Sequence, residues 1–424
     1  MKKFSLIYIA CMILTYSFAD NIVYETKSLN KNIKTVQIEN FSRKPYYPII
    51  ELGGKDKVTL SFDDLSPEIN TYSYSIIHCN ADWTKSKLNE FQYLNGFDGG
   101  FIRNYESSVN TYFPYTHYTL TFPNEDVTCT VSGNYIISVY PDNDKDNPVL
   151  TARFMVVESL VQINCTVSPI TDISYKKDYQ QMELSIDYPD YAINQPSTEL
   201  KVIVQQNRRT DNQAVLTQPS FYEQHKINYK LNKNLIFEAG NEYREFDISS
   251  TRVISRQIES IAYFKPYYHA TLYPDIIKSN KEYEYWQDIA GRYIINVQNS
   301  DYSETEGDYF FTHFSLAMEI PYLSGEIYIL GDITGNRFDD NSRMQYNYQT
   351  GSYEKTLLLK QGGYDYMYAF VPFGEKKGST KEIEGNKWET DNEYIVYVYH
   401  HPFGSIYDRL IGYQIVYSNQ YKRE

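Results

Sequence analysis

The sequence predicts an all-β protein made of tandem immunoglobulin-like β-sandwich domains, and three observations point to this fold class. Short stretches alternate hydrophobic and polar residues with a period of two, residues typical of turns separate these stretches, and tyrosine is abundant, with 45 Tyr and 21 Phe against 3 Trp. Alternation bounded by turns is typical of strands, and a Tyr ring can cover a half-buried sheet while its hydroxyl stays in water. Part of the tyrosine excess can instead come from an AT-rich genome, which also favours Asn, Ile and Lys. No long amphipathic helix is expected.

The length and composition allow about three packed domains, since the chain has 424 residues, 42% of them hydrophobic and 22% charged. After a signal peptide over residues 1–19, we expect a first β-sandwich over residues 20–158 and a second over residues 159–307. A third, immunoglobulin-like or E-set-like, is expected over residues 308–424.

The first nineteen residues have the layout of a secretory signal peptide. Lys2 and Lys3 form a basic start, the stretch Phe4–Phe18 is mostly apolar, and small residues precede a cleavage site after Ala19. Lipidation at Cys11 is the weaker alternative, because the residues before it make a poor lipobox and the apolar run continues well past it. No later stretch approaches ~18 apolar residues, so no membrane helix is expected, and the mature protein is predicted in an exported compartment.

In the first domain the alternation is clearest in two pairs of stretches. Residues 58–62 alternate and stop at two aspartates, and residues 118–122 do the same before Pro-Asn. Residues 135–140 and 149–157, joined by turn residues, predict a hairpin that closes the domain.

The remaining two domains show the same pattern over further stretches. The polar tract Gln205–Ser220 is expected to be an exposed loop. Strands are expected over residues 161–165, 182–186, 200–204, 246–248, 261–263, 309–318, 325–332, 344–347, 353–360, 364–370, 394–399 and 413–417.

Between Trp83 and Tyr112 the alternation fades. Leu88, Phe91 and nearby apolar residues have a helix-like or irregular spacing, with three glycines among them. We interpret this segment as a long connection with one helical turn. Long connections inside compact domains are often functional, so the segment is a candidate contact surface, while a packed crossover between two sheets explains the pattern equally well.

The net charge of −14 argues against two classes of partner. Nucleic acids and anionic membrane surfaces are bound through clusters of Lys and Arg, and the sequence has no such cluster. We therefore expect no nucleic-acid partner.

Cysteine is scarce for an exported protein. After cleavage only Cys79, Cys129 and Cys165 remain, an odd number with long spacings that does not make a disulfide framework. Three buried thiols are the simpler expectation, although one bridge is possible.

None of the usual catalytic motifs is present. The sequence lacks a Gly-rich phosphate loop, His-Glu-x-x-His, Cys-x-x-Cys and Gly-x-Ser-x-Gly. His400 and His401 are adjacent at the end of a predicted strand, so they should point to opposite faces and not share a metal, and the same holds for His78 and Cys79.

The acidic residues also fail to define a site. Asp142, Asp144 and Asp146 have the spacing of a calcium loop, but Asn147 and Arg153 stand where such a loop needs Gly and Glu, which favours a solvated turn. With 54 acidic residues, no pair stands out as a candidate for glycoside hydrolysis. We assign no catalytic, cofactor-binding or metal-binding residue, and expect neither an enzyme nor a cofactor.

Several long strings of the sequence resemble those of the type IX secretion system plug protein family, over nearly the whole mature chain. The segment Arg208–Asp211 departs from the pattern, because a more hydrophobic or Trp-bearing segment is expected there. The matching strings are Ile76–Trp83, Tyr93–Phe97, Tyr115–Tyr118, Ser132–Tyr135, Leu150–Val156, Ala239–Arg244, Phe246–Asp247, Tyr353–Tyr368 and Glu384–Thr390.

The resemblance implies a non-catalytic, periplasmic protein associated with the outer membrane. Its implied partner is the outer-membrane β-barrel translocon of the type IX secretion system, whose periplasmic mouth it binds and closes when no substrate is passing. No small-molecule ligand is implied. We hypothesise that Trp83–Tyr112, or an equally aromatic loop, enters the pore.

Two other functions remain open. One is a periplasmic carbohydrate-binding β-sandwich protein, because the third domain resembles the modules appended to glycogen- and starch-acting enzymes. Trp83, Trp286 and Trp388 lie in different predicted domains, which does not favour one shared stacking platform. The other is a hydrolase, which needs a pocket with converging carboxylates or histidines.

Overall fold

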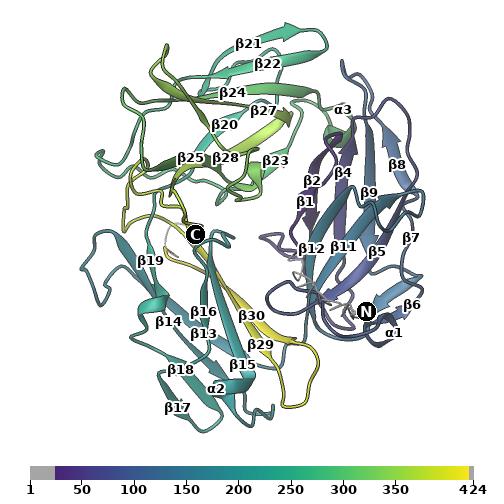
Figure 1. Cartoon of the computed structure of the whole chain (residues 1–424), viewed down its shortest axis with the longest axis vertical. Helices are drawn as coiled ribbons and strands as arrows, with labels where there is room; N and C mark the ends of the chain where they lie inside the picture. Colours follow the sequence, from purple (N-terminus) through teal and green to yellow (C-terminus); the bar gives the residue numbers. More distant parts are fainter. Residues whose placement is uncertain (1–23, 420–424) are drawn as a thin grey trace, which may run out of the picture.

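A computed structural model describes residues 24–419, so the predicted signal peptide (residues 1–19) lies outside the described residues. Strands make up 46% and helices 5% of the structure, which confirms the predicted all-β class. Within the described residues, no helix is long and apolar enough to cross a membrane. The strands form three β-sandwiches grouped around a common centre (Figure 1).

Domain 1 takes residues 24–158. Its first sheet contains, in order, β1 (Lys27–Ser28), β12 (Leu150–Val157), β11 (Gly133–Pro141), β5 (Tyr72–Cys79) and β7 (Gly100–Phe101), with β3 (Ile49–Glu51) beside β12. Its second sheet contains β2 (Ile33–Glu39), β4 (Val58–Asp64), β9 (Thr116–Phe122) and β8 (Asn104–Ser107). The smaller elements are α1 (Glu90–Tyr93), β6 (Leu94–Gly96) and β10 (Val127–Cys129).

The core of domain 1 confirms the strands predicted from alternation. Phe62 pairs with Tyr118 and Val58 with Phe122 across β4 and β9, and all four side chains are fully buried. Burying each such side chain stabilises the fold by about 1.5–3 kcal/mol. β11 and β12 form the predicted hairpin.

Domain 2 takes residues 159–239 and 390–418. Its first sheet contains β13 (Gln162–Ser168), β14 (Tyr179–Asp187), β18 (Lys226–Tyr229) and β17 (Phe221–Glu223), with β19 (Ile236–Glu238) also beside β14. Its second sheet contains β16 (Ala214–Leu216), β15 (Leu200–Gln206), β29 (Glu393–His400) and β30 (Arg409–Tyr417). The short helices are α2 (Pro196–Glu199) and η1 (Lys233–Leu235).

Domain 3 takes residues 240–389. Its first sheet contains β21 (Ile258–Phe264), β22 (Tyr267–Leu272), β24 (Tyr309–Ala317), β27 (Ser352–Lys360) and β26 (Gln345–Asn347). In the second, β28 (Gly362–Pro372) pairs with β20 (Arg244–Asp247), β23 (Tyr293–Ile295) and β25 (Gly325–Leu330). The short helices are α3 (Ser303–Glu306) and η2 (Asp332–Thr334).

The chain does not follow the predicted tandem order. β29 and β30, from the predicted third domain (308–424), pair with β15 in domain 2, whereas β20 to β23, from the predicted second domain (159–307), build domain 3. The yellow strands beside the teal ones in Figure 1 show this return of the chain. Domain 3 is therefore an insertion in domain 2. A period-two pattern predicts a strand but not its partner, which is why the sequence suggested a linear division.

Domains 1 and 2 share an apolar interface. Ile395, Tyr397 and Tyr399, on the outer face of β29, pack in one buried cluster with Ile49 and Val157 of domain 1. The opposite face of β29 lies in the core of domain 2, so the strand is buried on both sides.

Domains 1 and 3 meet at a buried ion pair. Asp63 Oδ2 accepts hydrogen bonds from Lys360 Nζ (2.6 Å) and the Tyr309 hydroxyl (2.7 Å), and His117 Nδ1 lies 2.7 Å from Oδ1. The Asp63 and Lys360 side chains are fully buried. Burial raises the pKa of Asp63, but Lys360 and His117 outweigh it, so the pKa lies below its ordinary value.

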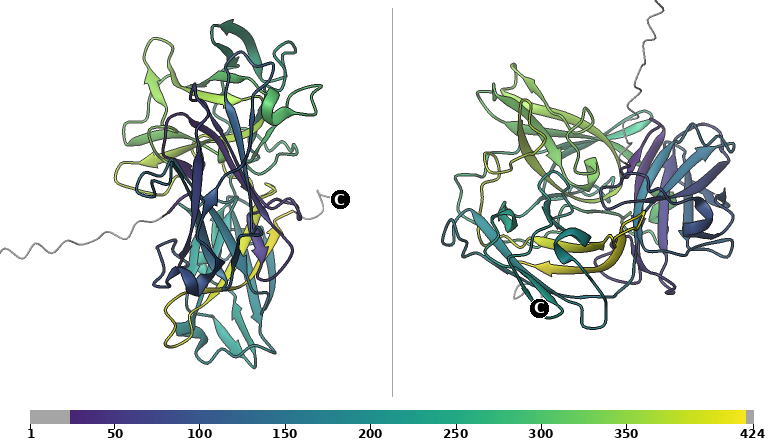
Figure 2. Two further views of the ribbon diagram at one scale, coloured as in Figure 1. Left: turned by 90° about the vertical axis from the view of Figure 1, so that its right-hand side faces the viewer. Right: turned by 60° about the horizontal axis from the view of Figure 1, so that its bottom comes forward.

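All three domains meet at Glu393. Its carboxylate accepts hydrogen bonds from the Tyr47 hydroxyl of domain 1 (2.6 Å), Arg292 Nη2 of domain 3 (2.5 Å) and the Tyr417 hydroxyl of its own domain (3.1 Å). Burial raises the pKa of Glu393, but Arg292 and Arg208 outweigh it, so the carboxylate stays ionised. The further views in Figure 2 show the same close grouping of the three domains.

Candidate interaction surface

The segment Trp83–Tyr112, predicted as a contact surface, divides into three parts. Its start is buried, because the Trp83 side chain is 9% exposed and the Arg153 guanidinium lies 4.3 Å from its ring centre. Its middle, residues 89–101, contains the predicted helical turn, α1, and the short strands β6 and β7. Its end contacts domain 3. The start of the segment is thus packed inside the molecule, whereas its middle and much of its end are exposed.

Three phenylalanines of the middle part are exposed, and we name these three residues together the aromatic tip. Phe91, Phe97 and Phe101 are 85%, 87% and 49% exposed. In Figure 1, α1 and β6 lie at the end of domain 1 that is away from domain 3, and β7 lies farther up the side of the domain. Single exposed apolar residues are ordinary on a soluble protein, but a cluster of large ones marks an interaction site.

Two glycines fix the backbone beside Phe97. Gly96 has φ +112° and Gly99 has φ +88°. A Cβ atom would lie 2.0 Å from the Asp126 carbonyl oxygen at Gly96, and 2.1 Å from the Tyr74 carbonyl oxygen at Gly99. Only glycine fits at either position, because the turn lies directly on the backbones of its neighbours.

The residue after Phe97 anchors the same turn. Asp98 Oδ1 accepts a hydrogen bond from the Ile76 backbone N–H (2.8 Å), and Oδ2 accepts one from Lys145 Nζ (2.9 Å). The Asp98 hydrogen bond raises the pKa of Lys145. Phe97 is therefore an almost fully exposed aromatic ring on a turn that is held on both sides.

The end of the segment is a contact between domains. The Val109 N–H donates to the Thr305 carbonyl (2.9 Å), and the Tyr112 N–H donates to Asp308 Oδ1 (2.7 Å). The Tyr112 ring also lies 4.6 Å from that of Tyr263. These contacts dock the end of the segment on domain 3.

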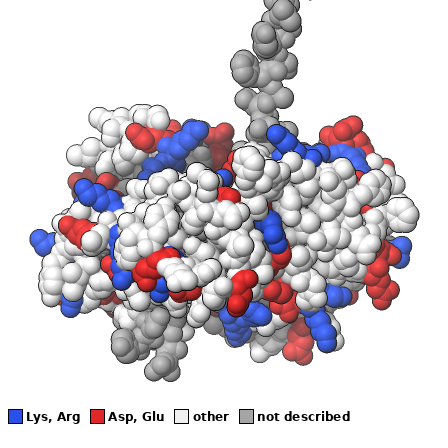
Figure 3. All heavy atoms as spheres, turned by 90° about the horizontal axis from the view of Figure 1, so that it is seen from below, with Lys and Arg blue, Asp and Glu red and all other residues white. Residues whose placement is uncertain are grey.

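A loop of domain 2 adds another exposed phenylalanine near the same end of domain 1. Phe403, between β29 and β30, is 99% exposed. Asp408 of this loop accepts a hydrogen bond from the Ala81 N–H of domain 1 (2.9 Å), which fixes the loop against that domain. Seen from below, uncharged atoms cover most of the centre of this end, and charged side chains of both signs lie mainly around its edge (Figure 3).

The histidines behave as predicted. His400 is buried and lies 2.6 Å from the Tyr191 hydroxyl, whereas His401 is exposed and lies 2.7 Å from Asp408. Burial lowers the pKa of His400, although Glu199 opposes this effect. The two adjacent rings point to different surroundings, as expected for neighbouring residues of a strand. No group of three or more possible metal-ligating side chains occurs in residues 24–419.

The remaining sequence candidates are structural. Asp142 to Asp146 lie in the exposed turn between β11 and β12. Cys79, Cys129 and Cys165 are free thiols, of which Cys79 is fully buried and the other two are half-buried.

The tryptophans do not form a sugar-stacking platform in the described structure. Each indole has one face covered by a cation of the same chain, with Arg153 at Trp83, Lys176 at Trp388 and Lys278 at Trp286. The cation–centroid distances are 4.3, 4.8 and 4.3 Å. Such contacts stabilise the fold and cover one of the two faces of each indole ring.

The tract Gln205–Ser220, predicted as an exposed loop, is partly buried. Arg209 is 7% exposed, pairs with Asp211 (2.7 Å) and donates from Nη2 to the Gly378 carbonyl of domain 3 (2.7 Å). Asp211 and other acidic neighbours outweigh burial and raise the pKa of Arg209. This role could not be predicted from the sequence, because the two contacting segments are far apart in the chain.

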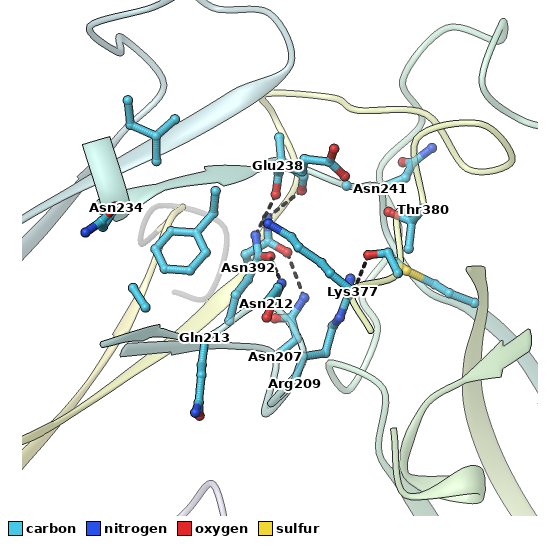
Figure 4. Close-up of a pocket in the computed structure, with 18 of the residues that line it drawn as sticks. Asn207, Arg209, Asn212, Gln213, Asn234, Glu238, Asn241, Lys377, Thr380 and Asn392 are labelled. Carbon is cyan, nitrogen blue, oxygen red and sulfur yellow. Dashed lines mark hydrogen bonds between the residues drawn. The ribbon is translucent and has the colours of Figure 1, made fainter. Parts of the chain in front are cut away.

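The tract also lines a cavity of about 460 Å³ where domains 2 and 3 meet (Figure 4). The lining is mostly polar and rich in side-chain amides. Buried hydrogen bonds join Asn207 to Asn392 (2.8 Å) and Gln206 to the Glu238 carbonyl (2.8 Å), so part of the wall is fixed.

Comparison with known proteins places the fold in a family. The family model described as the first domain of type 9 secretion system plug proteins matches residues 33–158. The crystal structure at 2.30 Å resolution of a hypothetical protein from Parabacteroides merdae ATCC 43184 is 41% identical, with a TM-score of 0.91, over 93% of this chain and 100% of that chain. No curated protein matches. The Pseudomonas fluorescens alkylpurine DNA glycosylase AlkC bound to DNA has a TM-score of 0.15 and 9% identity over 30% of each chain, a likeness that supports no argument.

Proposed function

We propose a function from one premise: this chain belongs to the type 9 secretion system plug protein family. In this proposal the protein works in the periplasm, binds the periplasmic side of the outer-membrane translocon barrel, and closes its pore when no substrate is passing. It is a non-catalytic component. The family assignment supports a role in the cell envelope, and the geometry of the aromatic tip supports the contact with a partner.

The observation that carries the proposal is the rigid exposure of Phe97. An aromatic ring that is 87% exposed loses contact with water only when a partner covers it. Because Gly96, Gly99 and Asp98 already fix the turn, binding costs little conformational entropy there. Aromatic anchors of this kind contribute a large share of the energy of many interfaces.

The grouping of the domains also suits a closing role. Three sandwiches around a common centre make a broad body, whereas the predicted row of domains would be narrow and long. The ion pairs at Asp63 and Glu393 fix the domains relative to one another. A fixed, broad body can cover an opening and still leave it as one unit.

Substitution of the tip tests the proposal. Phe97→Ser should weaken co-purification of the full chain with the detergent-solubilised barrel by about thirtyfold, or about 2 kcal/mol, because one aromatic anchor is lost. In cells it should raise entry of a large antibiotic that the outer membrane normally excludes. Phe373→Ser is the matched control, since Phe373 is 66% exposed on domain 3.

Two results would contradict the proposal. One is binding of the barrel by Phe97→Ser as tight as that of Phe373→Ser. The other is an outer membrane that stays equally tight after deletion of the gene in cells with an intact translocon.

A further inference from the structure

The cavity between domains 2 and 3 lies beside two short strands at the edges of their sheets. Its wall includes β16, whose partner is β15, and β19, whose partner is β14. Neither pairs with a second strand within residues 24–419, but on β19 the Glu238 carbonyl accepts from Gln206 Nε2 and the Ile236 N–H donates to the Lys233 carbonyl. The free edge is therefore that of β16. Backbone N–H and C=O groups along such an edge can pair with another extended chain.

The amide side chains around the cavity are only partly used. Asn212 donates to Gln206 Oε1 (3.1 Å), but its own buried Oδ1 has no hydrogen-bond partner in the described structure. A buried amide oxygen without a partner costs about 1–3 kcal/mol, so a ligand N–H group there would be favoured. Further amides from Gln213, Asn234 and Asn241 surround the same space. Side-chain amides both donate and accept, as the peptide backbone requires.

The charges around the cavity favour an anion. Lys377 and Lys233 line it and make no hydrogen bond or ion pair with other described residues. Figure 4 shows the Lys377 side chain running across the cavity. The remaining charged groups are Arg209, which pairs with Asp211, and Glu238, which accepts from Ser379 Oγ (3.1 Å). The lining therefore carries unpaired positive charge in a chain whose net charge is −14.

The aromatic residues of the lining offer little stacking surface. Phe237 and Tyr243 are 5% and 2% exposed, so their rings belong to the domain cores. A sugar bound here would lack the aromatic face that carbohydrate sites commonly supply, whereas an extended peptide needs none. A peptide would find backbone partners along the edge of β16 and side-chain amides beside it.

We propose that this cavity binds an extended acidic peptide segment, with its backbone along the edge of β16 and a carboxylate at Lys377. A segment of about six residues, about 20 Å long when extended, is enough to span such a site. The cavity lies away from the aromatic tip, so this proposal is separate from the proposal that the protein seals the barrel. If the cavity binds no peptide, the sealing proposal is not affected.

Binding of labelled peptides to the full chain tests the site. The probe is a fluorescein-labelled peptide of alternating Ser and Asp, compared by fluorescence anisotropy with the same peptide carrying Lys for Asp. The acidic peptide should bind saturably and more weakly at high salt, and the basic peptide should not bind. Lys377→Glu should raise Kd by at least about tenfold, which corresponds to about 1.4 kcal/mol.

Lys376→Glu is the matched control. Lys376 is the exposed neighbour of Lys377 and does not line the cavity, so this variant has the same net charge and should bind the acidic peptide like the wild type. Equal unfolding midpoints of the two variants show that both are folded. Three results would overturn the proposal of a peptide site. They are equal binding of the acidic and basic peptides, equal weakening of peptide binding by the two substitutions, and displacement of the acidic peptide by polygalacturonate.

Discussion

Removing the amine of Lys360 should show how much the buried contact between domains 1 and 3 contributes to stability. In Lys360→Met, Asp63 stays fully buried with the Tyr309 hydroxyl and the His117 ring but loses its cation. Breaking one partner of a buried pair costs about 3–5 kcal/mol, because the other charge is left without compensation. We therefore expect Lys360→Met to lower the free energy of unfolding by about that amount near pH 7, measured by urea titration.

The pH dependence of this loss follows from the pKa of Asp63. With Lys360 present that pKa is below its ordinary value, so the carboxylate contributes stability that is lost only as the pH falls through the folded-state pKa. Without Lys360 burial dominates and raises the pKa. A protonated carboxyl is neutral, so its burial costs less than burial of a carboxylate. The difference in free energy of unfolding between Lys360→Met and the wild type should therefore become smaller at acidic pH.

Two further variants separate the ion pair from a general effect of substitution. Lys355→Met, on the same strand but half-buried, should change stability by under about 1 kcal/mol. Asp63→Asn combined with Lys360→Met leaves no buried charge and should be more stable than Lys360→Met alone. If Lys360→Met unfolds at the same urea concentration as wild type at pH 7, the reasoning is refuted.

The other predictions concern a carboxyl group and the thiols. Burial, and after it repulsion from Asp288, raises the pKa of Asp365 to about 8 in the folded chain, whereas an Asp in the unfolded chain has a pKa of about 3.9. Between these two pH values the folded chain keeps a proton that the unfolded chain has released. The free energy of unfolding therefore falls as the pH rises from about 3.9 to about 8. Asp365→Asn should therefore gain stability relative to wild type from pH 5 to pH 8 in urea titrations, and a constant difference would contradict this. Burial raises the pKa of Cys79 to about 12 and of Cys165 to about 11, and also raises that of Cys129. In a chain without residues 1–19, these three thiols should therefore react with a thiol reagent at pH 8 only after the protein is unfolded. Rapid reaction of the native protein would contradict this prediction, because it would show that the thiols are accessible.

The strands were predictable because each depends on local pattern. Residues 58–62 and 118–122 alternate in sequence, and their apolar side chains are buried in register across β4 and β9. The partners of β29 were not predictable. Tyr394–Tyr399 is a continuous apolar run, which fits a strand buried on both faces but does not say what covers each face. Tyr394 and Ile395 are both fully buried, one in the core of domain 2 and the other against domain 1.

The contact surface was predictable as a segment but not as a set of residues. The glycines among Phe91–Phe101 indicated an irregular turn, and two of them do require positive φ. Sequence pattern alone could not separate the buried Trp83 from the exposed Phe97, because both are large aromatic residues in the same segment. Their difference depends on Arg153, which covers Trp83 from another strand.

The polar groups between the domains set their orientation more strictly than apolar contacts would. An apolar face can slide by an ångström at little cost, whereas the Glu393 carboxylate must meet Tyr47 and Arg292 from two other domains at hydrogen-bond distance. Any rotation of one domain would leave a buried charge without a partner, which costs more than the loss of a few apolar contacts. The aromatic tip on domain 1 and the Phe403 loop on domain 2 are consequently presented at one fixed relative angle, and a partner that fits both meets a single rigid surface.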